Sequence, residues 1–245
     1  MQLLFFDLEY ASSKENIKNI CEFGYVVTDE SFTIVERNNI IIDPGIRRSE
    51  WDWRVVRKIL TRKIEEYEKQ PIFPYFYSRI EGLLSKSDYI FGHSTCGDAE
   101  ALNDDCRKYK LPSLNYDFYD INEIYMEYSN SQISVSVENM LSALKVNGES
   151  RLHDAETDAY NTMLELKKMV ETMEMTVTDI LQLCPKAKGR AENYSVKSKK
   201  KRENEHYDSA GNRIVYSSGD PAKVTLGDMF KGVFDEYLER IEVKQ

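Results

Sequence analysis

Two carboxylates one residue apart, Asp7 and Glu9, directly follow the apolar run at residues 3–6. Four large apolar residues in a row are typical of a strand that is buried on both faces of a sheet. Because side chains alternate across a strand, Asp7 and Glu9 project from the same face, roughly 7 Å apart along it. Like charges at the end of a buried strand are unfavourable unless a cation lies between them. Carboxylate oxygens are the ligands of hard divalent ions such as Mg²⁺ and Mn²⁺.

The Asp-x-Glu pattern alone is weak evidence, because it recurs at residues 98–100 and 154–156, where we expect solvated helix surfaces. The strand that precedes Asp7 distinguishes the first copy from the other two. The alternative interpretation of this one feature is a solvent-exposed strand end that binds no ion.

Two further acidic positions lie at the ends of expected elements. Asp98 follows a short apolar strand at residues 88–92, where open α/β sheets bind ligands, although an N-cap role would also explain it. His153 and Asp158 are five positions apart, which is about 140° around a helix. Both can face one pocket only if His153 precedes the helix, and Asp154 as N-cap would place it there. This arrangement suits a metal-binding carboxylate beside a general base.

The elements that position these residues predict an α/β fold. Three strands in a meander, followed by alternating helices and strands, indicate a mixed five-stranded sheet with helices on its faces. We expect the strands at residues 3–9, 20–28, 33–42, 88–92 and 116–121. We expect the helices at residues 51–67, 76–84, 98–109, 136–146 and 155–173.

A change in composition divides the chain. Residues 1–175 are expected to form the α/β domain, and residues 176–222 a basic and polar linker or loop region. The basic run at 186–202 is interpreted either as a solvated linker or as a contact for nucleic-acid phosphates. Residues 223–245 are predicted to form a C-terminal amphipathic helix, because apolar side chains recur at helical spacing. This helix would pack on its own domain, or bind a protein partner or a second copy through residues 224–242.

Charge and cysteine usage narrow the classes of function. A formal net charge of −9 argues against a broad basic surface for nucleic acid, but not against an enzyme that reaches a phosphate through metal ions. The four cysteines are scattered, so we expect neither a disulfide framework nor a zinc site, and a reducing, cytoplasmic compartment fits. No apolar run reaches the length of a membrane span, so no membrane association is expected.

Taken in order, these motifs resemble those of the DEDDh 3′–5′ exonucleases, the superfamily of polymerase proofreading subunits, RNase T and oligoribonuclease. The resemblance covers roughly residues 2–172, and the chain departs from the family pattern at Tyr10, Ser94 and Gly97. The matching segments are residues 6–9 (Phe-Asp-Leu-Glu), 20–24, 42–44, 92–98 and 153–159.

The resemblance implies an RNase H-like fold and a two-metal exonuclease, with His153 as the general base. The enzyme would remove nucleoside 5′-monophosphates from the 3′ end of single-stranded DNA or RNA. The alternative is a catalytically weak module that keeps the fold and binds nucleic acid or a protein partner. The implied ligands of the two Mg²⁺ or Mn²⁺ ions are Asp7, Glu9, Asp98 and Asp158. The implied substrate-binding residues are Leu8, Tyr10, His93 and Ser94.

Overall fold

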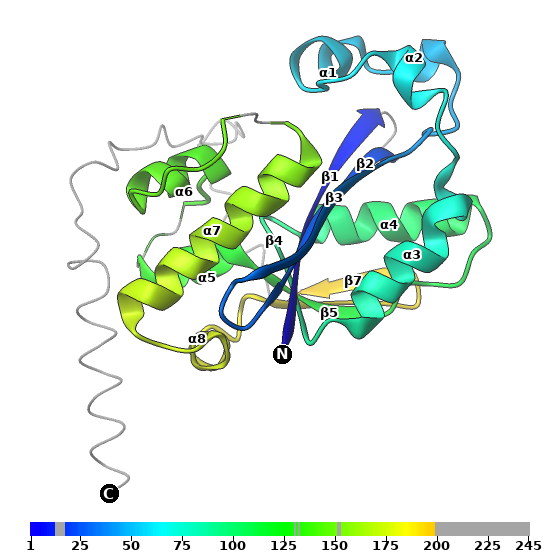
Figure 1. Cartoon of the computed structure of the whole chain (residues 1–245). Coiled ribbons are helices and arrows are strands. Elements are labelled where there is room, and N and C mark those ends of the chain that lie inside the picture. The colour runs from blue at the N-terminus through cyan, green and yellow to red at the C-terminus, as the bar shows by residue number, and fades with distance from the viewer. Residues whose placement is uncertain (13–17, 130, 132, 151–152, 199–245) are drawn as a thin grey trace, which may run out of the picture.

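A computed structural model gives the architecture of the N-terminal four-fifths of the chain (Figure 1). A seven-stranded mixed sheet organises it, with strand order β3-β2-β1-β4-β5-β6-β7. The C-terminal helix expected at residues 223–245 lies outside the described residues. The structure describes residues 1–12, 18–129, 131, 133–150 and 153–198.

The sheet combines an antiparallel meander with parallel strands. β1, β2 and β3 are antiparallel neighbours, whereas β4 runs parallel to both β1 and β5. β6 and β7 extend the other edge in antiparallel fashion. The strands are β1 (Gln2–Ser12), β2 (Asn19–Asp29), β3 (Ile34–Ile41), β4 (Tyr89–Gly92), β5 (Tyr116–Asp120), β6 (Lys188–Glu192) and β7 (Ser195–Ser198).

Helices cover both faces of the sheet (Figure 1). One face carries α5 (Ile121–Tyr128), α6 (Val137–Ala143), α7 (Ala155–Met173) and α8 (Val177–Leu183). The other carries α3 (Phe73–Lys86) and α4 (Cys96–Lys108). Beyond the end of β1 lie the short turn η2 (Arg48–Glu50), α1 (Trp53–Lys58) and α2 (Ile64–Tyr67). No helix in the described part of the chain is both long and apolar enough to cross a membrane.

The side chains of β1 point alternately into two hydrophobic cores, one on each face of the sheet. Leu3 and Phe5 are fully buried in the core beneath α7, whereas Leu4 and Phe6 are fully buried in the core beneath α3 and α4. Burying one such side chain contributes about 1.5–3 kcal/mol, so β1 is firmly held. Continuing the alternation assigns Asp7, like Leu3 and Phe5, to the α7 face of the sheet.

The sheet has seven strands rather than the five expected, although all five expected strands are present. The two additional strands, β6 and β7, come from residues that we expected to lie in a linker or loop. Gly189 and Ala191 are the buried positions of β6, and these small residues carry little hydrophobic signal. The aromatic ring of Phe118 occupies the space where a Cβ at Gly189 would lie. The outward-facing Lys188 and Arg190 pair with Asp117 of β5 at 2.7 and 2.8 Å.

The helices differ from expectation mainly between β3 and α3. One helix was expected at residues 51–67, but the segment forms α1 and α2 with a break between them. Arg62 lies in this break, where its guanidinium contacts Glu22 and Asp154 on other elements. A long-range contact thus interrupts a locally helical pattern. α5 and α8 were not predicted.

Candidate active site

The end of β1 carries the first two carboxylates of the site. Asp7 pairs with Gly24 of β2, and Glu9 pairs with Glu22, before the register shifts at the following residue. Glu9 is only 7% exposed and Asp7 is half-buried. The strand therefore places two acidic groups on the α7 face, away from bulk water.

Helix α7 approaches this strand end because residue 24 is glycine. A Cβ at Gly24 would overlap the backbone of Ala155 and Glu156 in the first turn of α7. Asp154 caps the helix by accepting a hydrogen bond from the N–H of Thr157 at 3.4 Å, as the sequence predicted. The close approach brings the first turn of α7 against the carboxylates of β1.

His153 and Asp158 meet at the start of this helix. His153 precedes it in a left-handed conformation, with a φ of 62°, and its side chain is exposed. Its backbone N–H donates a hydrogen bond to Asp158 Oδ2 at 3.1 Å. Ligand atoms of Glu9, His153 and Asp158 all lie within 4.8 Å of one another.

Asp98 lies in the first turn of α4, the helix that packs on the opposite face of the sheet from α7. It is 8% exposed and accepts a hydrogen bond from the Tyr10 hydroxyl. The ammonium of Lys18 lies 5.0 Å from the centroid of the Tyr10 ring, and its charge lowers the pKa of Asp98. The carboxylate of Asp98 also raises the pKa of Asp7, which ties α4 to the end of β1.

Burial, followed by mutual repulsion, raises the pKa of the acidic side chains. Burial and the charge of Asp158 raise the pKa of Glu9 to about 9. Burial raises the pKa of Asp98 to about 7 and that of Asp158 to about 6. The pKa of Asp7 lies well above its usual range, because of burial and then the charges of Asp98 and Glu9. Without a cation, the cluster therefore resists its own ionisation.

These residues fit divalent cations. Carboxylate oxygens are the donors that Mg²⁺ and Mn²⁺ prefer, and repulsion among them is relieved by a positive ion. In addition, Oδ1 of Asp158 is buried and accepts no hydrogen bond from any described residue. The chemistry of the donor set and this orphaned oxygen both point to metal binding.

The expected substrate-binding residues lie around the acidic cluster, and their role stays a prediction. Leu8 is 4% exposed and packs in the core beneath α3 and α4. Tyr10 contacts Asp98, as described above. The ring of His93 lies 3.3 Å from Glu165 Oε2 and 2.7 Å from the carbonyl oxygen of Val135.

Ser94 follows His93 in a left-handed conformation, with a φ of 60°. Its backbone N–H donates to Asp120 Oδ1 at 2.9 Å, and its hydroxyl accepts from Asn122 Nδ2 at 3.3 Å. These bonds fix the turn between β4 and α4, and therefore the start of the helix that carries Asp98.

Sequence reasoning assigned no role to a buried ionic network beside the site. Glu22, which is fully buried, accepts hydrogen bonds from Arg62 and Asn39 at 2.6 Å each and from the Tyr67 hydroxyl. Arg62 also lies 3.3 Å from Asp154, the cap residue next to His153. A lone acid within the apolar strand at residues 20–27 was the signal that could have revealed this network.

Comparison with known proteins decides the family. A sequence model of the RNase_T exonuclease family matches residues 4–166, about two-thirds of the chain. This chain belongs to the RNase_T exonuclease family. The resemblance to the DEDDh exonucleases is thereby confirmed, and divalent-metal dependence is typical of that family. No curated protein matches the sequence.

Solved exonuclease structures share the fold. A 3′-exonuclease described as recognising a histone mRNA stem-loop is 14% identical, with a TM-score of 0.65 over 80% of this chain and 70% of that chain. The nuclease domain of 3′hExo, a DEDDh family member bound to rAMP, is 16% identical, with a TM-score of 0.60 over 70% and 92%. E. coli Exonuclease I in complex with a dT13 oligonucleotide is 20% identical, with a TM-score of 0.54 over 70% and 41%.

Proposed function

We propose that this member of the family is a metal-dependent 3′–5′ exonuclease that releases nucleoside 5′-monophosphates from single-stranded DNA or RNA. The observation that carries the proposal is the convergence of four carboxylates and an exposed imidazole from three distant segments. Family membership supports nuclease activity, and the structural neighbours that are described as 3′-exonucleases support the polarity.

Asp7, Glu9, Asp98 and Asp158 would hold two Mg²⁺ or Mn²⁺ ions. Such a pair of ions stabilises the attacking and the leaving oxygen of an in-line displacement. The chain's own contribution is to hold the four acids in place through β1, α4 and α7. The hydrogen bond from Tyr10 orients Asp98, and the N–H of His153 orients Asp158.

His153 would act as the general base. Its ring lies beside Glu9 and Asp158 and is open to solvent, so an attacking water can reach a ring nitrogen. The proton of that water passes to His153 as its oxygen bonds to phosphorus. The bond to the 3′ oxygen of the preceding nucleotide then breaks, which leaves a shortened strand and a nucleoside 5′-monophosphate. Tyr10 and Ser94, supported by Leu8 and His93, would shape the pocket for the terminal nucleotide.

The test is digestion of 5′-labelled single-stranded DNA, single-stranded RNA and duplex oligonucleotides with Mg²⁺ or Mn²⁺. We expect a ladder that shortens from the 3′ end, with nucleoside 5′-monophosphates as products and no digestion in EDTA. Internal cuts or release from the 5′ end would contradict the proposed polarity. Intact substrates under all conditions would favour a binding module instead.

A further inference from the structure

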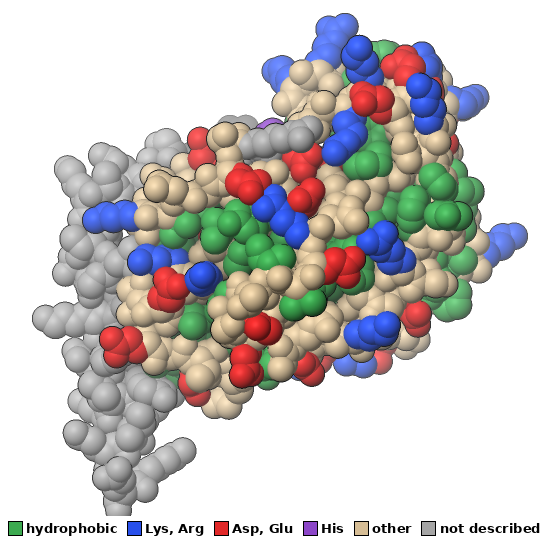
Figure 2. All heavy atoms as spheres, viewed as in Figure 1, with side chains coloured by type: hydrophobic (Ala, Val, Ile, Leu, Met, Phe, Trp, Pro, Cys, Tyr) green, Lys and Arg blue, Asp and Glu red, His purple; other side chains and the backbone are tan. Residues whose placement is uncertain are grey.

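Positive charge gathers at one end of an otherwise acidic protein. Residues 47–63 hold seven basic and two acidic side chains, in a chain of formal net charge −9. They form η2, α1 and the connection to α2, whose own acids Glu65, Glu66 and Glu68 follow directly. Figure 2 shows Lys and Arg side chains, with acidic ones among them, over this end of the molecule. A local excess of this kind attracts polyanions whatever the net charge of the whole chain.

Several of these cations are neutralised by neighbouring acids, but others are not. Arg48 pairs with Glu65 at 3.0 Å and with Glu68, and similar surface pairs join Arg47 to Glu50 and Arg54 to Asp52. Within the part of the chain that the structure describes, three exposed cations of α1 and its connection to α2 make no ion pair. These are Arg57, Lys58 and Lys63.

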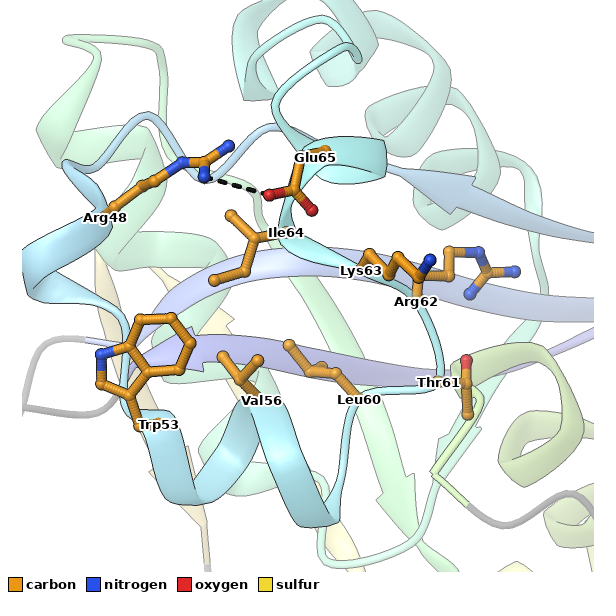
Figure 3. Close-up of a pocket in the computed structure, with 9 residues that line it drawn as sticks. All are labelled: Arg48, Trp53, Val56, Leu60, Thr61, Arg62, Lys63, Ile64 and Glu65. Atoms are coloured by element: carbon orange, nitrogen blue, oxygen red, sulfur yellow. Dashed lines mark ion pairs between the residues drawn. The ribbon is translucent and has the colours of Figure 1, made fainter.

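A hollow of about 380 Å³ lies between α1 and α2 (Figure 3). Val56, Leu60 and Ile64 contribute apolar surface, and the indole of Trp53 stands at one side. Trp53 is 53% exposed, which is unusual for the largest aromatic side chain, whereas Trp51 two residues earlier is fully buried. Of the unpaired cations, Lys63 lines the hollow, and Lys58 lies at the end of the adjoining α1. An open aromatic face with such cations has the features of a site for an unstacked base.

The hollow adjoins the catalytic site. Arg62, which lines it, also contacts Asp154, the residue that follows His153. In Figure 1, α1 and α2 lie beyond the end of β1 that carries the acidic residues. A strand whose end lies at the carboxylates can therefore continue toward this hollow.

We propose that the hollow binds a base of a single-stranded nucleic acid, outside the position of cleavage. The base stacks on Trp53, and the neighbouring phosphates lie near Lys58 and Lys63. The proposal rests on the proposed function, because it places the rest of the substrate strand relative to the reacting phosphate. The combination of an aromatic face, apolar walls and unpaired cations favours a nucleic acid over an acidic protein segment, which offers charge without flat bases.

Tryptophan fluorescence tests the stacking directly, because Trp53 is the one exposed tryptophan of two. A single-stranded oligothymidylate is titrated into the full chain in EDTA, so that no hydrolysis occurs. We expect the oligonucleotide to quench the fluorescence of the wild type. Affinity is measured in parallel from the anisotropy of a labelled oligonucleotide. Trp53→Ala should bind about tenfold more weakly, whereas Trp53→Phe, which keeps an aromatic face, should stay within about twofold.

The salt dependence of affinity tests the phosphate contacts. Each phosphate contact on a single strand contributes about 0.7 to the slope of log affinity against log salt, so Lys58→Gln/Lys63→Gln should reduce the slope by about 1.4. The matched control is Lys86→Gln/Lys110→Gln. Both of these lysines are exposed; Lys86 is the last residue of α3, and Lys110 lies two residues beyond α4. The control should bind with the wild-type slope.

Hydrolysis of a dinucleotide separates this proposal from the proposed function. If the hollow binds a base more than one nucleotide away from the bond that is cleaved, a dinucleotide does not occupy it. Trp53→Ala should then cleave a dinucleotide at the wild-type rate, while its KM for a long strand rises. Unchanged fluorescence with the oligonucleotide, or equal affinity of Trp53→Ala and wild type, would overturn the hollow as a base site. Equal quenching by polyglutamate would also overturn it. A wild type that binds and quenches but cleaves neither substrate would count against the proposed function alone.

Discussion

The proposed role of His153 depends on how this residue is held. A residue other than glycine with positive φ is uncommon, and His153 adopts this conformation at the start of α7. The hydrogen bond from its N–H to Asp158 and the cap at Asp154 fix the backbone, while the ring stays exposed. The imidazole is therefore close to the carboxylates without being buried among them.

Replacing His153 tests whether its ring moves a proton or binds an ion. We expect His153→Ala to lower kcat by about 10²–10⁴-fold, the usual contribution of a general base. Thermal unfolding with and without Mn²⁺ should still show stabilisation by the ion, because the four carboxylates remain. Loss of that stabilisation would identify His153 as a metal ligand instead.

The buried pair of His93 and Glu165 predicts a pH dependence of stability. Burial raises the pKa of Glu165 to about 7. Burial alone would lower the pKa of His93, but the hydrogen bond with Glu165 opposes this effect, and the pKa of His93 lies above its usual value. A carboxyl group whose pKa is higher in the folded state contributes most below its unfolded pKa, near 4.5, and loses that contribution as pH rises through about 7. Because the pKa of His93 is also raised in the folded state, its contribution to stability is likewise lost as pH rises.

The free energy of unfolding from urea titrations at pH 5 and pH 8 measures this effect. We expect the wild type to lose roughly 1–3 kcal/mol more than Glu165→Gln between these values, because glutamine has no proton to release. Identical losses for the two proteins would show that the Glu165 carboxyl does not titrate in this range.

The positions of the five residues that we propose as catalytic could be located in the sequence because each lies beside a local signal. An apolar run marks the strand before Asp7, and an N-cap residue marks the helix that begins after His153. The role of Glu22 could not be predicted in the same way. Its partner Arg62 lies 40 positions away, in a segment whose many charged residues are typical of a solvent-exposed helix.

At the scale of elements, the site depends on how closely α7 approaches β2. Gly24 permits this contact, since any side chain there would meet the α7 backbone. The glycine was visible in the sequence motif at residues 20–24, but its role requires the packing of a helix that begins more than 100 residues later. The sequence motif therefore identified the position of Gly24, but only the packing of α7 explains why glycine is needed there.

A pair of glycine substitutions tests this contact. Gly24→Ala should lower the free energy of unfolding by about 3 kcal/mol or more, as overpacking against backbone does, and it should displace Asp158 and abolish activity. The control is Gly82→Ala in α3, where a Cβ would meet nothing within 4 Å. This change should stabilise the protein by about 0.5–1 kcal/mol, because alanine favours a helix over glycine. Equal effects in chemical denaturation would contradict the close packing of α7 on β2.

Among the elements, those with a clear local hydrophobic pattern were predicted, whereas β6, β7, α5 and α8 were not. β1 and α7 have strong patterns, and both form as expected. β6 has only glycine and alanine on its buried side, so its strand period is concealed by an apparently basic and polar composition. Its position depends on pairing with β5, which no local pattern can show.

At the scale of the whole molecule, charge is divided between two regions. The acidic cluster lies at the junction of β1, α4 and α7, and the basic residues lie in η2, α1 and the connection to α2. The proposed binding of a polyanion is compatible with a net charge of −9, because bound cations would offset the acidic cluster. The mixed sheet, its helical layers and the basic stretch at residues 47–63 can be found in the sequence, whereas the acidic cluster is assembled only by tertiary structure.

The most direct test of the account is the rate of nucleotide release from a single-stranded oligonucleotide with Mn²⁺ by the wild type, Asp7→Asn and Asp104→Asn. Asp104 lies on α4, like Asp98, but outside the acidic cluster, and its partner is Arg107 on the surface. We predict wild-type activity for Asp104→Asn and a loss of at least about 10³-fold for Asp7→Asn, which should stay folded because a repelled charge is removed. An Asp7→Asn protein that digests the oligonucleotide as fast as the wild type would contradict the assignment of this site.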